Sequence, residues 1–449
     1  MSITRIFTEP FEILNIVTCR IHMEVNEHFS AVVEGYVQLE EEGYLEDMMS
    51  QTFVIKAYAE DEVMDLFRGN INDILLNGEG GLNRIVVSAK SKTVMLDSEK
   101  HFRTFHGIGQ TFRQITDAVL SFTRDVSTIH PKGRGICSDG LIVQYWETDW
   151  EFLKRLASQL NTVLVADCTN DSICFYFGNP DRRNGEHLDM KGHRMRRYIG
   201  FGGTEAVEYV VSSYKKFKLC DQVFIGGEPY YVYKIKSSYH KKELVFEYTF
   251  RTSGEFKTTP VRCEKIKGIS INGEVTDVRE TEVRVRLSSE ADFDFGSSLW
   301  FPYSTVYSSP DGTGWYCMPE KGDSIRLHIP GSKEQSAFVI SAVHMDNDSS
   351  LRENPDEKSI RTKYNKEIRL TPQRILITNN HGMSIILDDN EGILIKSNKK
   401  IEVVSEAGIE LKGGQVNMEG KKGVLLMEGP NMIMVRDGIK EQGMNIEHR

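Results

Sequence analysis

Three carboxylates lie close together in the segment QYWETDWEFLKRL, where Glu147, Asp149 and Glu151 are interleaved with two tryptophans and a threonine. Paired acids in an aromatic-lined cleft are the residue types of glycoside hydrolysis, in which one carboxyl protonates the leaving group and the other acts as nucleophile or base. A structural interpretation explains the same residues. Thr148 and Glu151 have the T-x-x-E spacing of a capping box, and acids in the first helical turn complement the helix dipole. We favour this interpretation and keep a peptidoglycan glycosidase as the alternative.

A strand that leads into a helix is the element expected to position these acids. The helix after Thr148 would carry one apolar stripe, formed by Trp150, Leu153, Leu156 and Leu160. An earlier helix is predicted after Thr111 by the same spacing, with the apolar positions Phe112, Ile115, Val119 and Phe122. β-Branched and aromatic runs before and after these helices, such as SAVVEGYVQL and ELVFEYTF, predict a mainly β chain with few helices.

Length and composition limit the classes of function. The chain has 449 residues, 39% of them hydrophobic and 27% charged, with a formal charge of −10. This acidic balance argues against a nucleic-acid partner and against an anionic membrane surface. Seven scattered cysteines without a CxxC pair match neither a disulfide framework nor a zinc site, and no metal or other cofactor is expected. With neither a signal peptide nor a membrane-length apolar run in the sequence, we expect synthesis in the bacterial cytoplasm.

The segment that holds the three acids resembles the Q-Y-x-E-[ST]-D-x-x-F-x-x-R-L signature of VgrG-type proteins and phage tail hub proteins. The matching residues are Gln144, Tyr145, Glu147, Thr148, Asp149, Phe152, Arg155 and Leu156. The resemblance implies that these residues are structural, and that residues 1–265 form a hub domain with two barrel-like tube subdomains. Gly226-Gly227 and the segment YHKKE stand where hairpin turns are expected in the second subdomain.

Short strands separated by turns follow from about Lys267 and predict a small barrel of the OB type at residues 266–345. This part also resembles the domain that follows the hub in VgrG and in phage baseplate assembly protein V. The matching residues are Trp300, Gly314, Pro319, Gly322 and Asp323, although the prolines of the family's next loop are absent.

The aromatic residues of this domain have two interpretations. Aromatic rings on an OB barrel can stack on nucleotides, but acids such as Asp292 stand beside them in the sequence and would repel a phosphate backbone. Packing in the core and contact between subunits are therefore preferred for Trp300, Phe301, Tyr303, Tyr307 and Trp315.

An eight-residue repeat follows a polar linker that is expected at residues 346–374. Isoleucine recurs at every eighth position, at Ile377, Ile385, Ile393, Ile401 and Ile409. From the second onward each has an apolar partner two residues later, on the same face of a strand. These partners are Leu387, Ile395, Val403 and Leu411. After a slip of one residue at Gly413-Gly414 the repeat resumes with Val416 and Val424.

The repeat predicts short strands whose inner apolar face is only two residues wide. One chain would bury too little surface with such strands, whereas three intertwined chains collect apolar side chains in every layer. We therefore expect residues 375–436 to form the core of a trimeric, triple-stranded β-helix needle, followed by a tail at residues 437–449. With about seven strands per chain and about 4.8 Å between strands, the needle would extend roughly 35 to 40 Å. A conventional two-sheet sandwich is the alternative, although it would not need a constant period.

A hub, an OB-type barrel and a needle in this order resemble VgrG and phage hub-spike proteins, the central spikes of contractile injection systems. The resemblance implies a homotrimer that carries the first ring of the inner tube protein, binds baseplate proteins and meets the target cell envelope on firing. The host particle would be a phage tail, a phage-tail-like bacteriocin or a type VI-like system, and no catalysis is expected. The H-x-H motif of iron-binding spike tips in related phages is absent, and His448 stands alone. From the resemblance alone, the hypothesis is that a separate PAAR-like tip protein caps the needle. A peptidoglycan-degrading hub and a receptor-binding fibre are the alternatives.

Overall fold

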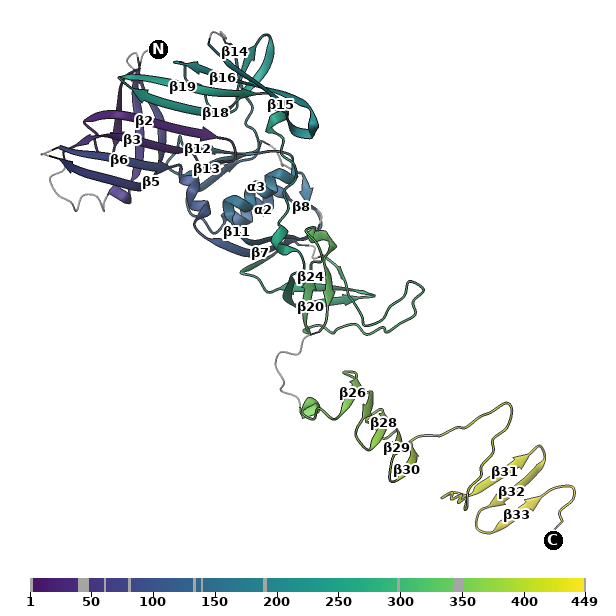
Figure 1. Cartoon of the computed structure of the whole chain (residues 1–449). Helices are drawn as coiled ribbons and strands as arrows, with labels where there is room; N and C mark the ends of the chain where they lie inside the picture. Colours follow the sequence, from purple (N-terminus) through teal and green to yellow (C-terminus); the bar gives the residue numbers. More distant parts are fainter. Residues whose placement is uncertain are drawn as a thin grey trace. The chain divides into compact units, whose positions relative to one another are not determined.

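The computed structural model describes residues 3–38, 48–59, 62–79, 82–131, 135–138, 140–188, 192–296, 299–342 and 350–447. Strands make up most of the secondary structure of these residues, which confirms the mainly β fold class. The chain forms two compact units, Met1–Met345 and Asp346–Arg449. The first unit holds both the expected hub and the expected barrel, and the second holds the repeat (Figure 1).

A twelve-stranded sheet combines strands from two separate segments of the first unit, residues 3–90 and 182–251. Its strands are β1 (Ile3–Glu9), β2 (Asn15–Glu24), β3 (Ser30–Val37), β4 (Thr52–Ala59), β5 (Glu62–Glu79), β6 (Leu82–Lys90), β14 (Arg182–His187), β15 (Arg194–Ile199), β16 (Glu205–Ser213), β17 (Asp221–Ile225), β18 (Glu228–His240) and β19 (Glu243–Arg251). The main path has the order β1-β4-β5-β6-β3-β2-β18-β19-β16-β15, and β17 pairs with β18 and β14 beside it. Two hairpin turns were predicted in the second tube subdomain, at Gly226-Gly227 and in YHKKE. The β17–β18 and β18–β19 connections confirm both.

Antiparallel pairing of β2 with β18 joins two segments that are far apart in the sequence. Figure 1 shows these strands side by side. Side chains alternate between the two faces of each strand, so that Ala31 and Val33 of β3 are buried while Val32 between them is exposed. The two segments expected as tube subdomains are thus continuous across one sheet.

Residues 92–177 form a smaller layer of strands and helices beside this sheet. Its elements are the 3-10 helix η1 (Lys92–Asp97), β7 (Lys100–His106), β8 (Gln110–Thr111), α2 (Phe112–Leu120), β9 (Val126–Ile129), β10 (Cys137–Ser138), β11 (Ile142–Thr148), α3 (Asp149–Gln159), β12 (Leu164–Asp167) and β13 (Ile173–Phe177). β11 pairs with β7, and β13 lies between β12 and β9. None of the helices in the described ranges is both long and apolar enough to cross a membrane.

Both helix starts predicted from the sequence are confirmed. The Thr111 hydroxyl accepts a hydrogen bond from the Gln114 amide at 3.1 Å, and the Thr148 hydroxyl accepts one from the Glu151 amide at 3.1 Å. One position of the first apolar stripe was predicted wrongly. Phe122 lies outside α2, because the helix ends at Leu120, and its ring is 58% exposed.

The expected OB-type barrel consists of β20 (Ser270–Arg279), β21 (Glu282–Leu287), β23 (Phe301–Pro302), β24 (Ser324–His328) and β25 (Phe338–Ile340). These strands pair in the order β23-β21-β20-β24-β25. The two ends of the sheet then meet, because Tyr303 bridges Val339 and the Ser304 amide donates to the Val339 carbonyl at 2.8 Å. The five strands thus close into a ring, as expected for an OB-type barrel.

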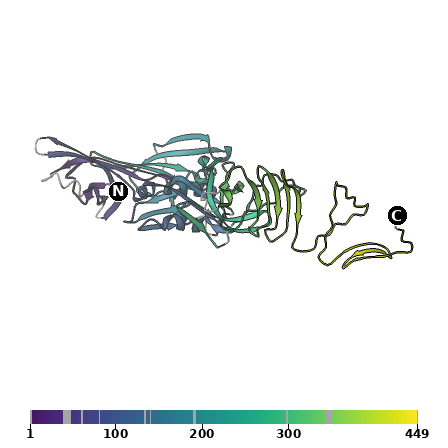
Figure 2. The same cartoon turned by 90° about the horizontal axis from the view of Figure 1, so that it is seen from below.

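The second unit contains two antiparallel meanders (Figure 2). The first has β26 (Lys358–Arg361), β27 (Glu367–Leu370), β28 (Arg374–Thr378), β29 (Ser384–Asp388) and β30 (Gly392–Lys396), and the second has β31 (Val424–Glu428), β32 (Asn431–Val435) and β33 (Ile439–Gln442). Residues 397–423 between them contain no strand. β26 and β27 lie in the stretch predicted as a linker, where Ile360 and Ile368 have the same eight-residue spacing, one residue out of register with Ile377. β33 lies in the predicted tail.

Candidate functional site

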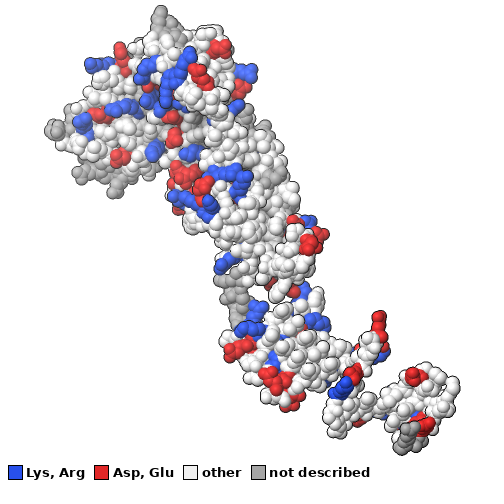
Figure 3. All heavy atoms as spheres, turned by 45° about the vertical axis from the view of Figure 1, so that its right-hand side comes forward, with Lys and Arg blue, Asp and Glu red and all other residues white. Residues whose placement is uncertain are grey.

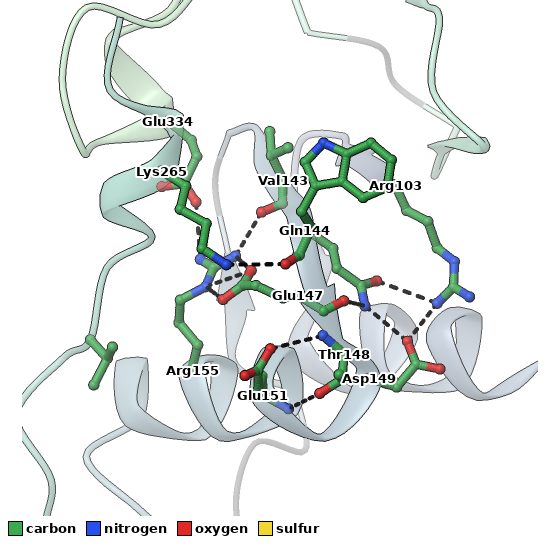
Figure 4. Close-up of polar contacts among 12 residues, drawn as sticks. Arg103, Val143, Gln144, Glu147, Thr148, Asp149, Glu151, Arg155, Lys265 and Glu334 are labelled. Atoms are coloured by element: carbon green, nitrogen blue, oxygen red, sulfur yellow. Dashed lines mark hydrogen bonds and ion pairs between the residues drawn. The ribbon is translucent and has the colours of Figure 1, made fainter. Parts of the chain in front are cut away.

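Arg155 on α3 is the centre of a buried charge cluster at the end of β11 (Figure 4). Its Nε and Nη2 atoms donate to the Glu147 carboxylate at 2.9 and 2.8 Å, in a two-pronged pair. Nη2 also donates to the Val143 carbonyl at 2.6 Å, and Nη1 donates to Glu334 Oε1 at 3.0 Å. Glu334 begins the 3-10 helix η5 (Glu334–Ser336) of the barrel. Arg155 therefore links the helix that carries the signature to the barrel.

Burial and neighbouring charges shift the pKa of Arg155 in opposite directions. Burial alone would lower the pKa of the guanidinium, but the hydrogen bond and the charge of Glu147, together with the charge of Glu334, raise it above its ordinary value. The side chains of all three residues are at least 88% buried, since their exposed fractions are 6%, 12% and 9%. Removal of Arg155 would leave two carboxylates without their cation inside the protein, which is far more costly than the loss of a surface pair.

A second buried ion pair joins Asp149 of the signature to Arg103 of β7, and Gln144 of the signature hydrogen-bonds to both residues. Arg103 of β7 donates to Asp149 Oδ1 at 2.7 Å and to the Gln144 side-chain oxygen at 3.3 Å. The Gln144 side-chain nitrogen donates to the same Asp149 oxygen at 2.9 Å and to the Glu147 carbonyl at 3.2 Å. These bonds fix the turn from β11 into α3.

Thr148 combines a helix cap with a link to η1. Its amide donates to Glu151 Oε2 at 3.0 Å, which completes the capping box, and its hydroxyl donates a short hydrogen bond to Asp97. His28 Nε2 lies 2.8 Å from the other oxygen of Asp97. Burial alone would raise the pKa of Asp97, but the hydrogen bonds from His28 and Thr148 hold it below its ordinary value.

The remaining signature residues pack in two different cores. Phe152 is fully buried and stacks on Phe105 in the core of the hub, with 5.4 Å between ring centroids. Tyr145 packs against the core of the barrel and meets the edge of the Phe102 ring at 5.4 Å. On β11 itself, Ile142 packs in the core of the hub, whereas Val143 and Tyr145 pack in the core of the barrel.

The three acids that could do glycoside chemistry have structural partners. Glu147 is paired with Arg155, Asp149 with Arg103, and Glu151 caps α3. A pocket of about 590 Å³ opens beside Glu147 and Glu151, and its lining contains no aromatic side chain among the described residues. An aromatic cleft with two free carboxyl groups, as the glycosidase alternative requires, is therefore not formed by these residues.

A strand of the barrel also enters the hub. β22 (Ala291–Asp294) pairs in parallel with β7, outside the barrel ring. Asp292 lies 2.8 Å from His106 Nε2 and accepts hydrogen bonds from the Thr104 hydroxyl at 2.6 Å and the Leu287 amide at 2.9 Å. Burial alone would raise the pKa of Asp292, but the hydrogen bond and charge of His106, with the other bonds, lower it.

The predicted barrel residues lie at turns and on the barrel surface. Trp300 contacts both Arg279 and Arg284, with each guanidinium carbon 4.4 Å from its ring centroid. Gly314 has φ +140°, and a Cβ atom there would come within 2.4 Å of the Tyr307 carbonyl oxygen, so the position requires glycine.

The P-x-x-G-D turn also has a clear geometry. Pro319 is buried, and the Gly322 amide donates to the Val275 carbonyl at 2.8 Å. Asp323 accepts from the Glu320 amide at 2.8 Å, and its own carbonyl accepts from the Val275 amide at 2.9 Å. This turn therefore attaches the start of β24 to β20.

Core packing and contact between subunits were preferred for the aromatic residues of this domain, and one chain shows core packing for some of them. Phe301 is buried and Tyr303 packs against the same core. Tyr307 and Trp315 are 51% and 59% exposed. Both belong to an ordered loop in which the Trp315 amide donates to the Tyr307 carbonyl at 2.9 Å, so these rings lie outside the core.

The repeat residues form apolar columns on one face of the first meander. Ile377 lies opposite Ile385, which lies opposite Ile395, and Leu387 lies opposite Ile393. All of these side chains are exposed in one chain, from 41% for Ile385 to 74% for Ile393.

The remaining repeat residues divide between the strand-free stretch and β31. Ile401, Val403, Ile409, Leu411 and Val416 lie in the strand-free residues 397–423, and each is at least half exposed. Val424 begins β31. Ile401 continues the series of large exposed apolar side chains beyond the last strand of the first meander.

Several partners of the signature were not found from the sequence. They are Arg103, which pairs with Asp149, Glu334, which pairs with Arg155, and Asp97, which accepts from Thr148 and pairs with His28. The pairing of His106 with Asp292 between β7 and β22 was not found either. The only signal for them was a charged or polar residue in a segment that also carries apolar residues, as with Arg103 between Phe102 and Phe105 in KHFRTFH. Such a signal indicates a buried polar contact but not its partner.

Comparison with solved structures places this architecture among known folds. A chain of the half-lidded Francisella PdpA-VgrG complex aligns over 88% of this chain and 88% of its own length, with a TM-score of 0.57 and 9% identity. The E. coli c3393 protein, described as a type VI secretion component similar to the T4 bacteriophage tail proteins gp27 and gp5, aligns over 75% and 99%, with a TM-score of 0.53 and 12% identity. The chain has the VgrG fold.

A third solved structure also matches this chain. A chain of the lidless PdpA-VgrG complex gives a similar result, with a TM-score of 0.55 and 9% identity over 86% of this chain and 94% of that one. No protein-family model and no curated protein matches the sequence. The similarity is therefore a similarity of fold, and the residues that form the buried clusters are described from this chain alone.

Proposed function

We propose that the protein is the trimeric hub and spike of a contractile injection system. One observation carries the proposal: a chain with the VgrG fold exposes columns of isoleucine and leucine on one face of its second unit. Large contiguous apolar patches mark interaction sites on soluble proteins. Packing against two further copies would bury these side chains, each with a gain of about 1.5 to 3 kcal/mol when fully covered.

Three copies suit the narrow inner face of the strands. Each strand of the first meander offers two apolar side chains on this face, as with Ile385 and Leu387 of β29. A layer that combines three such strands encloses six apolar side chains around an axis, whereas two copies would leave one side open to water. The strand-free residues 397–423 would acquire hydrogen-bond partners from the neighbouring chains in the same assembly.

The proposed role assigns a partner to each part of the chain. The hub would bind the inner tube protein and the baseplate proteins, and the end of the needle would bind a PAAR-like tip protein. Made in the bacterial cytoplasm, the trimer would assemble into the baseplate of a phage tail, a phage-tail-like bacteriocin or a type VI-like particle. Contraction of the sheath would then drive the needle into the target cell envelope. No nucleic acid takes part in this role.

The role is mechanical, and we propose that the chain catalyses no reaction. The pairing of Glu147 with Arg155 and of Asp149 with Arg103 supports this, because a general acid or nucleophile must be free to reach its substrate. Incubation of the pure protein with peptidoglycan tests it. Release of soluble muropeptides that is lost in E151Q, the variant of the most accessible acid, would establish the glycosidase alternative.

The mass of the purified chain in solution tests the trimer. Light scattering should give three times the 51.2 kDa of one chain at all protein concentrations above the micromolar range. A monomer at high concentration would contradict the proposal. A trimer that binds isolated surface glycans, and that fails to assemble with tube and baseplate proteins, would instead support a receptor-binding fibre.

A further inference from the structure

One face of the twelve-stranded sheet is charged across five neighbouring strands. The residues are Arg194 and Arg196 of β15, Glu208 of β16, Glu247 and Arg251 of β19, Lys234 and Lys236 of β18, and Glu24 of β2. They line a shallow pocket of about 420 Å³. Figure 3 shows Lys and Arg gathered in the upper part of the view, at the height where β14–β19 lie in Figure 1.

Cations exceed carboxylates on this face, although the chain as a whole has a formal charge of −10. Five Lys or Arg side chains line the pocket together with three Glu side chains. Each carboxylate is already paired, with Arg251 and Glu208 2.6 Å apart, Lys234 and Glu24 2.7 Å apart, and Arg194 and Glu247 also 2.7 Å apart.

Arg196 forms no ion pair with any of these three carboxylates. Among the described residues its guanidinium contacts the ring of Tyr198, 5.3 Å from the centroid, and no carboxylate. Lys236 is close to Glu247 only at 3.9 Å, and that carboxylate is shared with Arg194. Two cations on one face are thus available to a negatively charged ligand.

The backbone at this face is open as well. β15 pairs with β16 on one side, and within the described ranges it has no strand on the other side, so it is an edge of the sheet. An edge strand presents unpaired N–H and C=O groups to which an extended peptide can add. Side chains of an added strand alternate between the two faces, so every second one would stand beside Arg194 and Arg196.

We infer that the edge of β15 binds an extended acidic segment of a partner protein, with carboxylates at alternate positions opposite Arg194 and Arg196. The backbone of the segment would continue the sheet, and its carboxylates would compensate Arg196 and Lys236. A protein segment fits better than a nucleic acid, because Glu24, Glu208 and Glu247 lie among the cations and would repel a continuous phosphate backbone. The inference is independent of the needle and of the trimer.

A synthetic peptide of five Thr-Glu repeats, blocked at both ends and labelled at one, tests the inference with the full-length protein. Fluorescence anisotropy at low salt should show saturable binding that weakens as salt increases. R196E should reduce the affinity about tenfold or more, because it replaces a charge-assisted contact by repulsion. R197E is the matched control: Arg197 is on the same strand but the opposite face, paired with Glu205 at 3.0 Å, and its loss should change the affinity less than about twofold.

A second peptide tests the backbone part of the inference. The same sequence with methylated amides at alternate residues keeps its charges but cannot pair along β15, and it should bind much more weakly. If R196E elutes or melts differently from the parent, R196Q replaces it as the test variant. R196Q removes the charge without reversing it, so its loss of affinity should be smaller than that predicted for R196E. Absence of binding to the parent protein, an equal loss in R197E, or equal binding of an oligothymidylate of the same charge would each overturn the inference.

Discussion

Arg155 connects three parts of the first unit through one side chain. From α3 it forms ion pairs with Glu147 at the end of β11 and with Glu334 of the barrel, and it donates a hydrogen bond to the Val143 carbonyl of β11. Because the three charged side chains are buried together, this cluster also fixes the position of the barrel against α3. Arginine suits the site because its planar fork can donate to several acceptors at once.

Substitution of Arg155 by methionine should destabilise the first unit by about 3 to 5 kcal/mol, because two buried carboxylates lose their cation. R155K should lose less, since it keeps the charge but not the fork. The free energy of unfolding, measured in urea by tryptophan fluorescence, to which the buried Trp150 contributes, checks this. R113M is the control, because Arg113 forms an exposed pair with Asp117 at 3.5 Å and should contribute about 0.5 kcal/mol or less. Equal effects of R155M and R113M would contradict the assigned role.

The seam between β7 and β22 should be sensitive to acid. The pKa of Asp292 is lower in the folded protein than its unfolded value of about 4, so its contribution to stability is complete above that value and is lost as the pH falls through the folded pKa. The melting temperature should therefore fall between pH 5 and pH 3. D292N should melt lower than the parent at pH 7 and lose less on acidification, whereas D117N, on the exposed face of α2, should follow the parent.

Local chemistry explains which residue roles could be predicted. The capping boxes at Thr111 and Thr148 lie within four residues of sequence, and the structure confirms both. Arg103 and Glu334 could not be assigned, because their partners are 46 and 179 residues away in the chain. A sequence indicates that a buried charge needs a partner, but the fold decides which residue supplies it.

At the scale of elements, the strands of the second unit follow the spacing of the apolar residues. The eight-residue period places Ile377, Ile385 and Ile393 in three successive strands, β28, β29 and β30. The same period continues through Ile401 and Ile409, where one chain forms no strand. A strand needs a hydrogen-bonded neighbour, and the intertwined trimer would provide it from another chain.

A pair of substitutions on β30 tests which face lies inside the needle. Ile393 and Leu394 are both exposed in one chain, at 74% and 53%, but they point to opposite faces of the strand. I393D should abolish the trimer, because it would place three carboxylates together in an apolar layer. L394D should leave the trimer intact. The mass of each variant by light scattering checks this, and a trimeric I393D variant would show that the period of eight has another cause.

The joining of distant elements could not be predicted from the pattern. The pairing of β2 with β18 and of β22 with β7 connects segments about 200 residues apart. Alternation identifies a strand and its buried face, but a strand with one apolar face can pair with many others. The barrel itself could be predicted, because all five of its strands come from one continuous segment.

At the scale of the whole molecule, the VgrG fold and the exposed apolar face together support a hub that ends in a needle. Electron microscopy of the purified full-length protein tests this claim most directly. Averaged images should show a head with threefold symmetry and a thin stalk, and a label fused to the C-terminus should appear at the far end of the stalk. A compact monomeric particle without a stalk would contradict the account.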